Sequence, residues 1–164
     1  MSFAFLAAGF LAATNAGRLA LTCQADRPPA RSVGLALLAG FGVVAVAVAF
    51  ANDLLDALDI SPESFRIAAG LVLGVAGART LVWPHPAPGP FAAVLVTPDL
   101  AFVALSFGAD EVTWKVLAAA GVALPFLLAA AVRPRGPMAL AAQFLAALEV
   151  VVAVALIVSG VRDV

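Results

Sequence analysis

The sequence predicts an all-α membrane protein with six transmembrane helices, arranged as two inverted three-helix repeats. Of its 164 residues, 64% are hydrophobic and 12% are charged, whereas a soluble domain carries about 25% charged residues. Apolar runs bounded by charge or proline recur along the chain, and a helix needs about 20 such residues to cross a bilayer. Two of these runs are interrupted inside, at residues 14–17 and 97–99. The interruptions predict that the first helix of each repeat is broken.

The composition also argues against several classes of function. The net charge is −1 and the nine lysines and arginines are scattered, so we expect no binding to nucleic acid. The single cysteine, Cys23, cannot form an internal disulfide or a paired-thiol site. The single histidine, His85, makes neither a metal cluster nor a catalytic triad. We therefore expect no catalytic residue, no metal site and no cofactor, and the protein is not predicted to be an enzyme.

The first repeat, residues 1–83, has predicted helices at about residues 3–22, 33–51 and 66–83. We predict that the first helix is broken at residues 14–17, because asparagine competes for backbone hydrogen bonds and glycine leaves the backbone unrestricted. No positive charge precedes its apolar run, so we interpret it as a retained helix rather than a secretory signal.

The segment between the second and third helices carries two local signals. In residues 52–60 the three aspartates lie on one side of a helical turn, and the leucines and the isoleucine lie on the other. This pattern predicts a short turn at the membrane interface. Serine, proline and glutamate at residues 61–63 predict a helix start, with a capping hydroxyl and an acid in the first turn. Within the third helix, Gly70, Gly74 and Gly77 offer a smooth face for another helix of the same chain or of a second subunit.

The second repeat, residues 91–164, follows a stiff connector with four prolines in residues 84–90. Its helices are predicted at about residues 91–107, 112–132 and 138–161. In the first of these, Pro98 removes a backbone donor and clashes with the preceding turn. The next residue, Asp99, would then lie near the middle of the membrane, where unpaired backbone and a carboxylate persist only around a protein-lined or water-filled site.

The charges orient the six spans. Arginines dominate the side reached after the first, third and fifth helices, and acids dominate the opposite side. The positive-inside rule then places both termini outside a plasma membrane that the chain crosses several times. Because each repeat has an odd number of spans, the two repeats have opposite orientations. The predominantly basic side holds Arg18, Arg27, Arg31, Arg79, Arg133 and Arg135; the other holds Arg66, Lys115, Arg162, Asp53, Asp56, Asp59, Glu63, Asp110, Glu111 and Asp163.

The candidate site residues follow from the two breaks, since interrupted helices in corresponding positions point to a binding site in mid-membrane. We predict that solute is bound by Asn15, Gly17, Thr97, Pro98 and Asp99, and that Asp99 and Glu149 couple transport to a proton or an ion.

Each candidate has a structural alternative. Asp99 could instead cap the helix that follows it, and Glu149 could be a neutral carboxyl group hydrogen-bonded between helices. Asn15 and Gly17 could serve only the geometry of a turn. Two further residues, Arg18 and Arg79, could either reach a substrate carboxylate or extend to lipid headgroups.

Three stretches resemble the MarC family of membrane proteins, which belongs with the LysE-type exporters. Residues 60–70 (ISPESFRIAAG) look like the segment that opens the family's third helix. Residues 15–17 resemble its Asn-Pro-x-Gly stretch, and residues 91–106 are similar to its fourth helix. The resemblance implies six helices in two inverted repeats and, for some members, movement of small neutral amino acids. The sequence departs from the family pattern at Ala16, where proline is frequent, and at Asp99, where small residues are usual.

The leading hypothesis is a secondary transporter or exporter that moves a small polar solute, such as a neutral amino acid, by alternating access with proton coupling. No Gly-x-x-x-x-Gly-Lys loop is present, so an ion gradient, downhill flow or a separate subunit would supply the energy. A divalent metal-ion permease and a non-transporting scaffold subunit are the alternatives. The expected partners are the lipid bilayer, the solute and a second copy of the chain in a homodimer.

Overall fold

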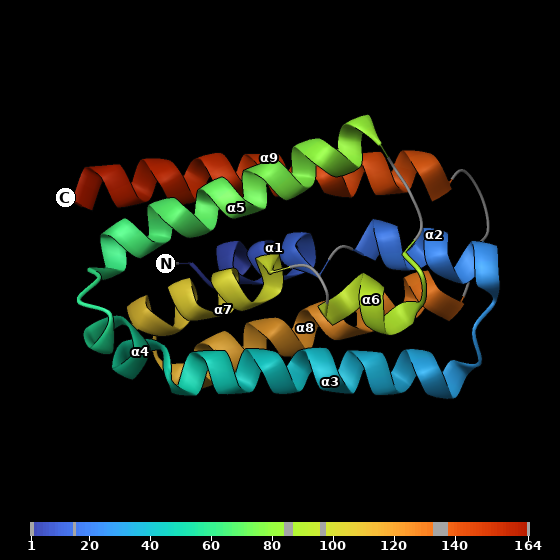
Figure 1. The fold of residues 1–164 in the computed structure, drawn as a ribbon, viewed down its shortest axis with the longest axis horizontal. Coiled ribbons are helices and arrows are strands. Elements are labelled where there is room, and N and C mark those ends of the chain that lie inside the picture. Colours follow the sequence, from blue (N-terminus) through green and yellow to red (C-terminus); the bar gives the residue numbers. More distant parts are fainter. Residues whose placement is uncertain (1, 15, 84–86, 96–97, 133–137, 164) are drawn as a thin grey trace.

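The computed structural model describes residues 2–14, 16–83, 87–95, 98–132 and 138–163, and every regular element among them is an α-helix. The predicted all-α class is therefore confirmed. The helices lie along a common long axis (Figure 1). They are α1 (Phe3–Ala13), α2 (Ala16–Asp26), α3 (Ala30–Ala49), α4 (Ala51–Ala57), α5 (Pro62–Val82), α6 (Pro90–Leu95), α7 (Asp99–Asp110), α8 (Thr113–Val132) and α9 (Met138–Asp163).

Three helical segments in the described chain are long and apolar enough to cross a membrane. They are α3, α5 and the part of α9 from Gln143 to Asp163. Two shorter apolar stretches are Phe3–Ala13 and Thr113–Ala123. Large apolar side chains also face outward: those of Leu38, Val75 and Phe144 are each more than two-thirds exposed. A surface of this kind suits lipid rather than water.

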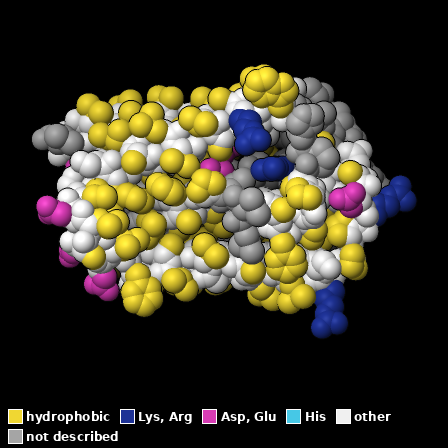
Figure 2. Space-filling view, viewed as in Figure 1, with side chains coloured by type: hydrophobic (Ala, Val, Ile, Leu, Met, Phe, Trp, Pro, Cys, Tyr) yellow, Lys and Arg dark blue, Asp and Glu magenta, His cyan; other side chains and the backbone are white. Residues whose placement is uncertain are grey.

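Charge is separated along the bundle (Figure 2). Acidic side chains gather at the end where the chain begins and ends, and most basic side chains lie in the opposite half, with apolar side chains between them. The start of α1, the end of α9 and all of α4 belong to the acidic end, whereas the end of α2 and the start of α3 belong to the basic one (Figure 1).

Contacts between helices fall into matching pairs. The contact of α1 with α8 matches that of α6 with α3, and the contact of α2 with α9 matches that of α7 with α5. α3 also packs on α8, and α5 on α9; each of these two pairs runs antiparallel (Figure 1). One contact breaks this matching. α1 packs on α9, but the corresponding pair, α6 and α5, has no contact of similar extent among the described residues.

The glycines of α5 allow close packing against α9. A Cβ atom built at Gly70 would lie 2.8 Å from the carbonyl oxygen of Ala153 in α9, and one at Gly77 would lie 3.0 Å from that of Ala146. At Gly74 the nearest atom is 3.4 Å away, an ordinary contact. The predicted smooth face is therefore confirmed as a contact inside the chain, between α5 and α9.

The local signals around residue 61 are borne out, but some helix ends differ from expectation. Ser61 caps α5, because its Oγ accepts a hydrogen bond of 3.3 Å from the Ser64 backbone N–H. α5 consequently begins at Pro62, as that signal predicts, four residues before the membrane-spanning part expected from about residue 66. α2 continues to Asp26, one turn beyond the expected end, since residues too polar for a membrane core can still be helical outside it.

Candidate functional site

Both interruptions fall where one helix ends and another begins. α1 ends at Ala13 and α2 begins at Ala16; α6 ends at Leu95 and α7 begins at Asp99. Asn15 and Thr97, two of the predicted solute-binding residues, lie outside the described residues. Gly17 lies in the first turn of α2, and Pro98 is an exposed residue immediately before α7.

Asp99 is the first residue of α7, and its side chain is only 1% exposed. The residue in the N-cap position is Pro98, so Asp99 is not the capping residue that one sequence interpretation expected. It lies instead in the first helical turn, where the positive end of the helix dipole favours an acidic side chain. The fold therefore places a carboxyl group in the interior at the start of a helix.

Glu149 comes from α9 and is also only 1% exposed. Its Cβ atom faces Gly77 of α5, whose missing side chain leaves room for it. Among the described residues, none donates a hydrogen bond to Oε1 of Glu149, so the expectation of a carboxyl group bridging helices is not met at this oxygen.

The Glu149 and Asp99 carboxyl groups interact electrostatically, although they come from different helices. Both predicted coupling residues thus lie in the interior, within electrostatic range of each other. Two ionised carboxylates within that range and away from water repel, and a bound proton or cation relieves the repulsion.

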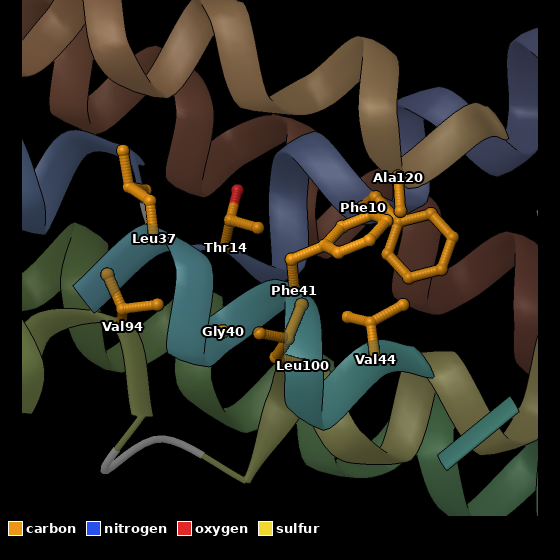
Figure 3. Close-up of a pocket in the computed structure, with 9 residues that line it drawn as sticks. All are labelled: Phe10, Thr14, Leu37, Gly40, Phe41, Val44, Val94, Leu100 and Ala120. Carbon is orange, nitrogen blue, oxygen red and sulfur yellow. The ribbon is translucent and has the colours of Figure 1, made fainter. Parts of the chain in front are cut away.

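A small cavity of about 20 Å³ lies beside the helix ends (Figure 3). It has room for about one water molecule, so a larger solute would enter only after the helices move. Among the described residues that line it, only Thr14 at the end of α1 has a polar side chain; its hydroxyl donates a 3.0 Å hydrogen bond to the Leu11 carbonyl. The lining residues are Phe10, Thr14, Leu37, Gly40, Phe41, Val44, Val94, Leu100 and Ala120.

Two buried polar residues were not named as site residues from the sequence. Thr14 is the first residue of the predicted break at residues 14–17, and its position there was the available signal. Ser106 is 1% exposed and lies seven residues after Asp99 in α7. Because residues seven apart share one face of a helix, that spacing could have placed Ser106 on the face of Asp99.

A third missed feature is an ion-pair cluster at the acidic end of the bundle. Arg66 in α5 is buried and donates to Asp110, the last residue of α7, through Nε at 2.9 Å and Nη2 at 2.6 Å. Its Nη1 donates to Asp163 of α9 at 2.5 Å. No spacing in the sequence indicated this three-helix contact. It ties α5, α7 and α9 together at one end.

Comparisons with protein-family models, curated proteins and solved structures give no match to the chain. The MarC resemblance therefore stays a prediction that rests on the short motifs quoted above.

Proposed function

We propose that the protein is a secondary transporter that moves a small polar solute across the plasma membrane by alternating access. Its six crossings would be the α1–α2 pair, α3, α5, the α6–α7 pair, α8 and α9, with both termini outside. The repeats would be residues 1–83 and 91–164, joined by the connector at 84–90. Neutral amino acids are the first solute class to test.

The buried pair of Asp99 and Glu149 is the observation that carries this proposal. A carboxylate at the centre of a membrane span costs about 2.5–3.5 kcal/mol on insertion scales, and two of them interact here at about 1% exposure. A protein that only needed a stable bundle would fill these positions with apolar residues at lower cost. A pair of this kind is typical of a proton or ion pathway.

The packing pattern supports the inverted repeats. Exchanging α1 with α6, α2 with α7, α3 with α8 and α5 with α9 reproduces most of the helix contacts. The exchanged helices also run in opposite directions along the bundle (Figure 1). A two-fold axis in the membrane plane relates the halves of many transporters in this way, with the substrate site at their interface.

The helix ends suit the binding of a polar solute. The start of α7 offers backbone N–H groups and a positive dipole end near the cavity, and the end of α1 offers carbonyl groups. In the proposed cycle the solute binds at Asn15, Gly17, Thr97 and Pro98. Asp99 and Glu149 exchange a proton as the site opens to one side and then to the other.

The test is flux in proteoliposomes with an imposed pH gradient and labelled neutral amino acids. Wild type is compared with D99N and E149Q, and with D56N as a matched control at an exposed aspartate of α4. We expect gradient-driven flux in wild type and D56N, and its loss in both buried-site variants. The reason is that D99N and E149Q each remove a buried proton-binding group, because asparagine and glutamine cannot bind a transferable proton.

Three results would overturn this proposal. Flux that persists unchanged in folded D99N and E149Q would show that the pair does not couple transport. Flux of divalent metal ions that D99N abolishes, without amino acid flux, would favour the metal permease. Correct folding without flux of any solute would favour the scaffold subunit.

A further inference from the structure

A second and larger pocket, of about 280 Å³, lies between α2 and α5 at the basic end of the bundle. It is lined by Arg18 from α2 and by Arg79, Thr80 and Trp83 from the end of α5. Figure 2 shows two basic side chains bordering a hollow in the surface. The volume approaches that of pockets that bind small molecules, about 300 Å³ and above.

The two arginines differ from Arg66 in what surrounds them. Arg66 is neutralised by two aspartates. Among the described residues, neither Arg18 nor Arg79 forms an ion pair. Two like charges at one pocket repel each other unless an anion lies between them. The planar guanidinium group suits a carboxylate or a phosphate, which it can bind through two parallel hydrogen bonds.

The pocket lies about one helical turn from the contact between Gly77 and Glu149. Thr80 in the pocket lining is three residues after Gly77, so it lies about one helical turn further along the same face of α5. Gly77 in turn abuts Glu149. The basic pocket therefore lies about one helical turn from the buried Glu149. In Figure 2, acidic atoms are visible beside the hollow that the basic side chains border.

We propose that Arg18 and Arg79 bind the carboxylate of a zwitterionic amino acid, whose ammonium group is directed toward Glu149 and Asp99. The inference rests on the proposed transport function and specifies its substrate class, because only a zwitterion complements both charges at once. A lipid phosphate has the same oxyanion chemistry as the carboxylate, so the test must separate a soluble ligand from a lipid.

Trp83 provides a direct probe of the pocket. The only other tryptophan, Trp114, lies at the start of α8, at the opposite end of the bundle. In a W114F background the fluorescence of Trp83 is titrated with alanine, with propionate as the anion alone and with ethylamine as the cation alone. The protein is held in phosphatidylcholine nanodiscs, with and without phosphatidylglycerol.

We expect saturable binding of alanine, at least tenfold weaker binding of propionate and none of ethylamine. R18Q/R79Q should abolish the alanine response. R27Q/R31Q removes the same charge from exposed positions near the same end and should leave the response intact. E149Q should retain propionate binding but lose the preference for alanine over propionate.

The inference is overturned if the folded protein gives no saturable response, if only phosphatidylglycerol changes the signal, or if R27Q/R31Q abolishes alanine binding as R18Q/R79Q does. The binding and flux measurements can also fail independently of each other. Flux lost in D99N but retained in R18Q/R79Q would reject the arginine pocket and keep the transporter. Alanine binding lost in R18Q/R79Q, in a protein without flux, would keep the pocket and reject transport.

Discussion

Gly77 of α5 lies directly against Glu149 of α9: a Cβ atom built on the glycine would be 3.1 Å from the Cβ atom of the glutamate. The same added atom would be 3.0 Å from the carbonyl oxygen of Ala146. Because that oxygen belongs to the backbone, it cannot turn aside as a flexible side chain would. The absence of a side chain at this position therefore sets the distance between the two helices and the place of the buried carboxyl group.

G77A should push α5 and α9 apart. We expect a loss of about 1–3 kcal/mol in stability, as for other overpacked cores, and a matching loss of flux because Glu149 moves with α9. The measurement is thermal unfolding in detergent, followed by the proteoliposome assay. G74A is the matched control, since its new methyl group would make only an ordinary 3.4 Å contact with Ala153. Equal stability of G77A and G74A would contradict the prediction.

The Arg66 cluster should stabilise the acidic end of the bundle. Its side chain is 8% exposed and that of Asp110 is 13% exposed, so R66A leaves a carboxylate that is largely shielded from water. Removing one partner of such a pair costs about 3–5 kcal/mol. D163N should cost at most about 1 kcal/mol, because the Asp163 side chain is 54% exposed. Unfolding temperatures in one detergent test this order, and a larger loss for D163N than for R66A would refute it.

Thr22 of α2 anchors residue 87, which precedes α6. Its buried Oγ1 accepts a 2.9 Å hydrogen bond from the backbone N–H of Ala87 and donates one of 2.8 Å to the Arg18 carbonyl. T22V keeps the shape but leaves that N–H without its acceptor, which should cost about 1–3 kcal/mol. T80V is the control, since among the described residues the Thr80 hydroxyl bonds only to the Ala76 carbonyl of its own helix. The two unfolding temperatures should differ, and a T80V loss as large as that of T22V would argue against a specific anchor.

The orientation of the bundle is open to direct labelling. Replacing Cys23 by alanine removes the only thiol, and single cysteines are then introduced as D56C at the acidic end and R31C at the basic end. Both positions are exposed. A membrane-impermeant maleimide should label D56C in intact cells and R31C only after permeabilisation, as the positive-inside rule requires. The reverse pattern would invert the proposed topology, and labelling of both in intact cells would reject an odd number of crossings between them.

The sequence by itself determined the features that depend on neighbouring residues and on transfer from water to lipid. The α6 and α7 helices are separate around Pro98, as the loss of a backbone donor predicts. Ser61 and Pro62 set the start of α5, because capping acts within one turn. The gathering of most charges at the two ends also follows from the sequence, since a charged side chain is costly in hydrocarbon.

The tertiary structure alone decided which distant residues meet. Asp99 lies within electrostatic range of Glu149, Arg66 joins two aspartates, and Arg18 shares a pocket with Arg79. Each of these contacts joins separate helices, and the rotation of each helix about its axis selects the residue that points inward. That rotation depends on packing, above all on the glycine contact between α5 and α9. The sequence could therefore indicate that Asp99 and Glu149 needed partners, whereas only the packing of the helices could supply them.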